Sequence, residues 1–417
     1  MDRKEIIALG NETEKELLNE GVFARLEKTA LFCQERVMRA FADCRISESH
    51  FVGTTGYGYD DRGRDTLEQV YAKVFECEDA LVRHTIVSGT HALCVGLFGL
   101  LRPGNTMLSV TGKPYDTLDE VIGLRGEGMG SLRDFGIHYR GIELSNGKID
   151  IAAMEKALAE DPSITMVYIQ RSKGYALRPT LCAEEIGEAI RAAHAAKPSV
   201  YAVVDNCYGE FCDEHEPTYY GADLAIGSLI KNPGGGMAET GGYLAGTKKA
   251  VELVSYRLTT PGIGKEAGAS LGQTKPMYKG LFYAPHTVLQ ALKTAVFAAR
   301  LFEKMGYTVS PSANEPRHDI VQTLTLGSEE KLLKFCEGIQ AGAPIDSNVI
   351  PEAWEMPGYA DRVVMAAGAF TSGASIELSA DGPVKPPYVA YMQGGLTYES
   401  GKLGILLAAE KLSAEEK

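Results

Sequence analysis

The sequence has little positive charge for its size: 42 lysines and arginines stand against 55 aspartates and glutamates in 417 residues, a net charge of −13. This balance argues against nucleic acid or an anionic membrane surface as the main partner. No window approaches the roughly eighteen continuous apolar residues of a membrane span, and the polar start Met1–Glu5 offers no signal core. We therefore expect a cytoplasmic protein whose partner is a small molecule.

Paired cysteine motifs are missing as well. The eight cysteines are scattered and form no C-x-x-C pair, which in a chain of this length fits reduced thiols rather than a disulfide framework. Cys207 and Cys212 match no common metal-binding spacing, so we expect structural thiols and no bound metal. The composition, 45% hydrophobic and 23% charged, is that of an ordinary globular protein.

Hydrophobic periodicity predicts three parts. Residues 1–50 show a helical period, and from about 80 to 250 short β-rich runs alternate with helical patterns. That alternation predicts an α/β fold with a mostly parallel sheet. We predict an N-terminal helical arm (1–55), a large α/β domain (56–280) and a smaller C-terminal α+β domain (281–417). Expected strands are 80–87, 106–110, 165–169, 201–204, 224–226, 242–245, 319–325 and 362–366, and expected helices are 66–75, 92–101, 285–305, 329–340 and 401–412.

Lys231 and Asp205 each end an apolar run, and Lys231 precedes a turn of one proline and three glycines. A buried ammonium is costly unless it is paired, neutralised or bonded to another group, and lysine shifts its pKa readily when it loses water. A pyridoxal phosphate (PLP) enzyme needs such a pair, because the lysine forms an imine with the cofactor and the aspartate pairs with its ring nitrogen. The two residues therefore predict bound PLP.

Four further positions suit that cofactor. Gly89 and Thr90 stand between a strand and an apolar helix, where free N–H groups and the helix dipole favour a phosphate; a plain helix cap is the alternative. Ser228 can reach the same phosphate or else bond its own backbone. Tyr115, on the loop after the next strand, can stack on a pyridine ring or simply pack as a half-buried loop residue.

The order of these motifs resembles the Cys/Met-metabolism group of fold type I PLP enzymes, which includes cystathionine lyases and methionine γ-lyase. Segments 169–179, 228–236, 367–383 and 391–396 look closer to one branch, the methionine γ-lyase-like or aluminium resistance protein family. The resemblance implies a fold type I transferase-like fold. It assigns Lys231 as the Schiff-base lysine, Asp205 as the pyridinium partner, Tyr115 as the stacking ring, and Gly89, Thr90 and Ser228 to the phosphate.

The same resemblance implies an oligomer. In the wider group, a Tyr-x-Arg element from a partner subunit completes the phosphate site. Tyr57, Tyr59 and Arg62 lie in the comparable glycine-rich segment of this chain. The family precedent is a homotetramer built from dimers that share active sites.

One departure concerns the substrate carboxylate. Lyases of the wider group bind it with an arginine on a strand near the C-terminus, but the comparable strand at 389–396 contains none. Arginine is the side chain best shaped to bind a carboxylate bidentately. The candidates to replace it are Arg171, Arg178 and Arg362, each of which can instead be a structural or solvated residue.

The implied activity is that of a carbon–sulfur lyase of the methionine γ-lyase or cystathionine β-lyase type. Such an enzyme removes the Cα proton of a sulfur amino acid and eliminates a thiol from Cβ or Cγ. Lys231 is the expected base, and Tyr115 assists it. The alternatives are other PLP chemistry (aldol cleavage, transamination or γ-replacement) and a PLP-binding stress or metal-resistance protein with little turnover.

Overall fold

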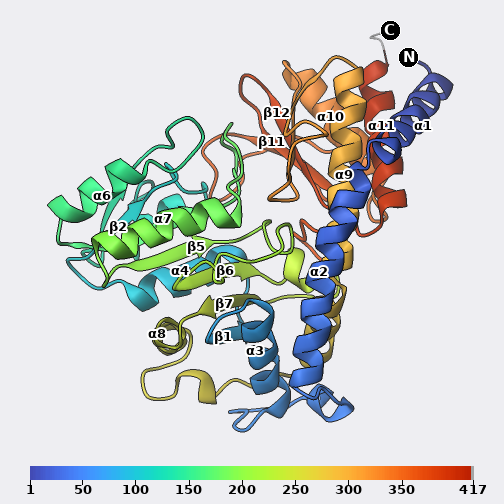
Figure 1. Cartoon of the computed structure of the whole chain (residues 1–417). Coiled ribbons are helices and arrows are strands. Elements are labelled where there is room, and N and C mark those ends of the chain that lie inside the picture. The colour runs from blue at the N-terminus through green and yellow to red at the C-terminus, as the bar shows by residue number, and fades with distance from the viewer. Residues whose placement is uncertain (415–417) are drawn as a thin grey trace.

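The computed structural model describes residues 1–414 and contains two separate β-sheets (Figure 1). The strands of the larger sheet are β1 (Asp79–Arg83), β2 (Thr106–Ser109), β3 (His138–Gly141), β4 (Ile164–Gln170), β5 (Tyr201–Asp205), β6 (Leu224–Ser228) and β7 (Gly242–Gly246). They lie in the order β1-β7-β6-β5-β4-β2-β3. Strands β2 to β6 pair in parallel, whereas β7 and β1 pair antiparallel at one edge. The predicted α/β fold with a mostly parallel sheet is confirmed.

Helices cover both faces of this sheet: α3 (Arg62–Val74), α4 (Gly89–Leu100), α5 (Leu118–Ile122), α6 (Ile151–Glu160), α7 (Ala183–Ala196) and α8 (Lys248–Leu258). Side chains of a strand alternate between the two faces. In β4, Met166 and Tyr168 therefore pack with the side of α4 and α8, whereas Val167 and Ile169 pack with α6 and α7. Burial on both faces explains why these strands are almost continuously apolar.

The chain also forms three long helices, α1 (Arg3–Asn19), α2 (Val22–Asp43) and α9 (Thr274–Lys304). Helix α1 packs with α9 and α11 (Tyr398–Ser413) at the smaller sheet. Figure 1 shows α2 running along α9. The predicted helix start near residue 285 is wrong, because α9 begins eleven residues earlier and carries Pro285 inside it. None of the helices between residues 1 and 414 combines the length and apolarity that a bilayer crossing requires.

The middle of α9 fixes the turn that follows Lys231. Short 3-10 helices occur at Glu48–Phe51, Asn232–Gly234 and Gly264–Glu266, and the second of these belongs to that turn. A Cβ atom on Gly280 of α9 would collide with the backbone of Gly234, and a Cβ atom on Gly235 would collide with the backbone of Gly280. Gly235 also has a φ of +53°, which favours glycine. The glycine run after Lys231 therefore lets two backbones meet directly.

The smaller sheet is antiparallel throughout. Its strands are β8 (Thr308–Ser310), β9 (Gln322–Thr325), β10 (Val363–Ala366), β11 (Ser379–Pro383) and β12 (Val389–Gln393), in the order β10-β11-β12-β9-β8. It packs against α9, α10 (Glu329–Ala341) and α11 (Tyr398–Ser413), which confirms the expected α+β character. The strand predicted at 319–325 is shorter because the chain turns at Asp319, whose carboxylate accepts a hydrogen bond from Val321 N at 3.0 Å.

Candidate active site

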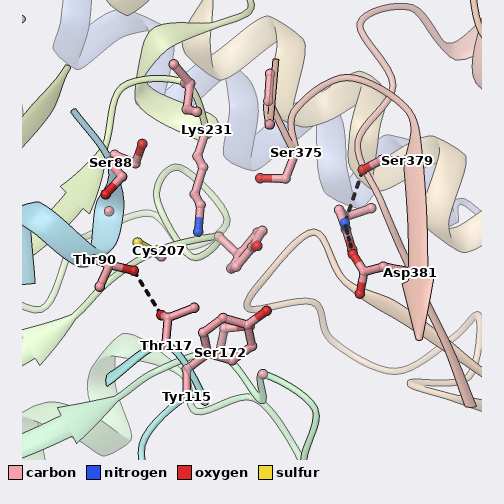
Figure 2. Close-up of a pocket in the computed structure, with 18 of the residues that line it drawn as sticks. Ser88, Thr90, Tyr115, Thr117, Ser172, Cys207, Lys231, Ser375, Ser379 and Asp381 are labelled. Atoms are coloured by element: carbon pink, nitrogen blue, oxygen red, sulfur yellow. Dashed lines mark hydrogen bonds between the residues drawn. The ribbon is translucent and has the colours of Figure 1, made fainter. Parts of the chain in front are cut away.

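A cavity of about 470 Å³ lies where the parallel strands of the larger sheet end and the smaller sheet approaches them. Ligands of open α/β sheets bind at this edge, beyond the carboxyl ends of the strands, and the volume is within the usual range for small-molecule sites. Six predicted site residues line it together: Gly89, Thr90, Tyr115, Asp205, Ser228 and Lys231. Figure 2 shows Lys231 reaching into this space, with Thr90 and Tyr115 around it.

Lys231 lies three residues beyond the end of β6, at the start of the glycine turn. Its Nζ atom sits 3.9 Å from the centre of the Tyr208 ring, a cation–π distance. Burial acts to lower the pKa of Lys231, but the acidic groups of Cys207, Tyr208 and Asp205 raise it above its usual value overall. These neighbours therefore favour the charged form of the lysine.

Asp205 is the last residue of β5, and its backbone is held between β4 and β6. Its Oδ1 accepts a hydrogen bond from Cys207 N at 3.1 Å, and its Oδ2 accepts one from the Tyr168 hydroxyl at 3.4 Å. Burial raises the pKa of Asp205, whereas Lys231 and the Cys207 bonds act to lower it. A carboxylate so placed can pair with a cation inside the cavity.

The N-terminus of α4 forms another wall of the cavity. Ser88 caps the helix, its Oγ accepting from His91 N at 3.0 Å, and the Thr90 hydroxyl contacts that of Thr117 at 2.8 Å. A Cβ atom on Gly89 would stand 3.5 Å from Ser228 Cβ and 4.0 Å from Lys231 Nζ, so glycine keeps this corner open. Ser228 Oγ is buried and makes no hydrogen bond within residues 1–414, which disfavours the alternative that it bonds its own backbone.

Tyr115 is tied to both parts of the molecule. Its backbone N–H donates to Gln170 Oε1 at 2.7 Å, and its hydroxyl contacts that of Tyr359 at 2.8 Å. Its ring meets those of Tyr175 and Tyr359 edge-on at 5.6 and 6.0 Å. Burial raises the pKa of Tyr115, so the hydroxyl stays neutral at ordinary pH.

Tyr57, Tyr59 and Arg62 do not line this cavity in the same chain. The two tyrosine rings stack on each other at 5.4 Å, and 71% of Tyr57 and 54% of Tyr59 is exposed. Their segment is held in place by backbone hydrogen bonds from Gly268 to Tyr57 O at 2.8 Å and from Leu271 to Thr54 O at 3.2 Å. The residues thus form a fixed, protruding surface.

The three arginines considered for the substrate carboxylate also lie outside the cavity lining. Arg171 is fully buried and donates to Asn206 Oδ1 at 2.7 Å and to Asp213 Oδ2 at 2.6 Å. Arg178 bonds backbone carbonyls, and Arg362 pairs with a glutamate at the surface. Each therefore has a structural partner already.

The cavity also includes residues to which the sequence motifs assign no function. Tyr208, Tyr359, Ser375, Asp381 and Gln393 all line it. Two signals were present: Ser375 and Asp381 fall inside segment 367–383, and Gln393 falls inside 391–396, both of which carry the family resemblance. The position of Tyr359 has no comparable signal.

These residues fit PLP chemically. A lysine amine stands beside a buried carboxylate, and a helix N-terminus lies next to an unpartnered hydroxyl and a glycine that leaves the corner open. The arrangement offers a covalent anchor, a partner for a ring N–H and donors for a phosphate. Of these groups, Ser228 Oγ makes no hydrogen bond within residues 1–414 and is therefore open to a ligand.

The fold is that of the fold type I PLP enzymes. A solved PLP-dependent protein, YhfS from Escherichia coli, superposes with a TM-score of 0.60 at 16% identity, covering 92% of this chain and 95% of that one. Within this class the chain belongs to the methionine gamma-lyase family, whose model matches residues 6–413.

Two relatives are similar over nearly their whole length. The uncharacterized protein YnbB of Bacillus subtilis (strain 168) is 52% identical over 398 residues, covering 95% of this chain and 94% of the relative. The crystal structure of a carbon-sulfur lyase involved in aluminum resistance from Clostridium novyi NT is 50% identical, with a TM-score of 0.93 and coverage of 98% and 96%.

Proposed function

We propose that the protein binds PLP and is a carbon–sulfur lyase acting on a sulfur amino acid. The observation that carries this proposal is the convergence of Lys231, Asp205 and the open corner at Gly89 and Ser228 in one cavity. The family membership and the name of the Clostridium novyi protein support the same reaction class.

Each group in the cavity has one task in this proposal. Lys231 would hold the cofactor covalently, Asp205 would pair with its ring nitrogen, and Tyr115 would pack on its ring. The N–H groups at the start of α4, with Ser228 Oγ, would hold its phosphate. When bound, the cofactor supplies a sink for the electron pair left on the substrate's α-carbon.

Lys231 is also the base that we assign to the Cα proton. It is the lysine that lines the cavity, so its Nζ can reach the α-carbon of a substrate held there. To act as a base it must lose its proton. Asp205 is one of the groups that raise the pKa of Lys231. If Asp205 pairs with another cation, it raises that pKa less, so Lys231 loses its proton more easily. Elimination then releases a thiol, and hydrolysis of the remaining fragment gives ammonia and a 2-oxo acid.

The purified protein tests the proposal directly. We expect a visible absorbance band from a lysine-bound cofactor, together with release of thiol and 2-oxo acid from a sulfur amino acid. Lys231→Ala should lose both after dialysis, whereas Lys385→Ala, at an exposed lysine paired with Asp361, should keep both. A colourless wild-type protein that takes up no added PLP would overturn the proposal.

We also propose a homo-oligomer, a tetramer built from dimers, in which a second copy completes the site. The support is the exposed and rigidly held segment with Tyr57, Tyr59 and Arg62, which has no role in its own cavity. Sedimentation velocity gives the assembly, and a monomer with full activity would contradict it.

A further inference from the structure

The cavity wall formed by the smaller sheet carries a second carboxylate. Asp381 and Ser379, both on β11, line the cavity on the side away from Ser88 and Thr90 (Figure 2). The charged residues of the lining are Lys231, Asp205 and Asp381. The lining thus holds two carboxyl groups and one amine.

Asp381 has a neutral partner but no cation. Gln393 Nε2 donates to Asp381 Oδ2 at 3.1 Å and also approaches Ser379 Oγ at 3.1 Å. Within residues 1–414, no lysine, arginine or histidine forms an ion pair with Asp381, although its charge lies within electrostatic reach of Lys231. A buried carboxylate is costly without a cation, so this position lacks its natural counter-charge.

Burial also affects the protonation of this group. It raises the pKa of Asp381, while the Tyr175 hydroxyl, the Gln393 amide and Lys231 act to lower it. A cation that enters beside Asp381 favours its ionised form. Tyr115 and Tyr359 line the same cavity, and the faces of tyrosine rings attract cations and not anions.

The substrate's own α-amino group is not available to Asp381. Lys231 would hold the cofactor, so the substrate's α-amino group would lie at the Lys231 side of the cavity. The other charged lining residue, Asp205, would pair with the cofactor ring. A positive group that reaches Asp381 must therefore belong to the far end of the substrate.

We propose, on the basis of the carbon–sulfur lyase function above, that Asp381 binds a cationic group on the sulfur substituent of the substrate. The preferred substrate class is then a thioether amino acid whose leaving thiol carries an ammonium group. An amino acid with a small neutral substituent on sulfur, such as methionine, is a poorer substrate. Asp381 is a specificity residue in this reaction, and Gln393 positions its carboxylate.

Two matched pairs of compounds test this. S-(2-aminoethyl)-L-cysteine and S-propyl-L-cysteine differ by an ammonium in place of a methyl group, and the corresponding homocysteine pair serves if elimination occurs from Cγ. The PLP-loaded wild type, Asp381→Asn and the control Glu329→Gln, at an exposed glutamate, are compared. The readouts are kcat/KM for thiol release and, independently, the dissociation constant from calorimetry.

We expect wild type and Glu329→Gln to favour the aminoethyl compound by about 30-fold, the lower range for a buried charge pair. Asp381→Asn should bring that ratio close to one, because kcat/KM and affinity should fall for the aminoethyl compound alone. Equal use of both compounds by wild type, or an equal loss for both in Asp381→Asn, would overturn the inference and leave the lyase function standing. Binding preference without thiol release from any compound would overturn the lyase function instead.

Discussion

We predict that removal of the Ser228 hydroxyl stabilises the PLP-free protein but weakens the binding of PLP. Ser228 is fully buried, and its Oγ has no hydrogen-bond partner in the described part of the chain. An unsatisfied buried polar group costs about 1–3 kcal/mol. We therefore expect Ser228→Ala to raise the free energy of unfolding of the PLP-free protein, by about 1 kcal/mol or more.

The same substitution should weaken cofactor binding. If Ser228 donates to the phosphate, its loss removes a hydrogen bond to a charged group, worth about 1.5–3 kcal/mol. This corresponds to a roughly 10- to 150-fold higher Kd for PLP. Denaturant or thermal unfolding of the PLP-free protein gives the first effect, and titration with PLP followed by absorbance gives the second.

Ser109 provides the matched control. It is also a buried serine at the end of a strand, but its Oγ donates to Gly112 O at 2.6 Å and does not line the cavity. Ser109→Ala should therefore lower stability by about 1 kcal/mol and leave the Kd for PLP unchanged. The reasoning is refuted if Ser228→Ala destabilises the PLP-free protein as Ser109→Ala does, or if it binds PLP as tightly as wild type.

Three further predictions concern other parts of the molecule. Mixing inactive Lys231→Ala with inactive Arg62→Ala should restore about a quarter of wild-type activity if two copies share a site, and no recovery in a kinetic assay would exclude sharing. Asp205→Asn should retain measurable PLP by absorbance yet lose turnover by orders of magnitude. Burial raises the pKa of Glu210 to about 8, above the ordinary value of about 4.3. The folded protein therefore keeps a proton that the unfolded chain releases, and stability should fall as pH rises from about 4.5 to 8. Glu210→Gln should flatten this dependence in thermal unfolding curves.

The strands of the larger sheet other than β3 were predictable because their signal is local. A strand buried on both faces is apolar at nearly every position, as residues 164–170 and 201–205 are. The start of α9 was not predictable, because proline is common at the first position of a helix and Pro285 therefore looks like a start. No residue nearby shows that the helix already runs from Thr274. The short exposed strand β3 has no apolar pattern to find.

Some residues of the candidate site were likewise predictable from the sequence, and others were not. Lys231, Asp205, Gly89 and Tyr115 follow strands that end at one edge of the sheet, so chain order alone brings them together. Asp381 and Tyr359 reach the cavity only because the smaller sheet and its connecting segment dock there, which depends on contacts remote in sequence. Arginine candidates chosen by residue type failed to reach the lining, since buried acids and carbonyls bind Arg171 and Arg178.

The 2.8 Å contact between the Tyr115 and Tyr359 hydroxyls is one of several hydrogen bonds that join the two halves of the cavity wall. Such a bond contributes only about 0.5–1.5 kcal/mol net, within a few times the thermal energy. Because Arg125 Nη1 also donates to Tyr359 O at 2.9 Å and the Tyr391 hydroxyl donates to Tyr175 O at 2.7 Å, loss of the tyrosine pair alone leaves the two halves connected. An amino acid that passes this wall must therefore break several hydrogen bonds at once, none of which involves the anchored turn of Lys231.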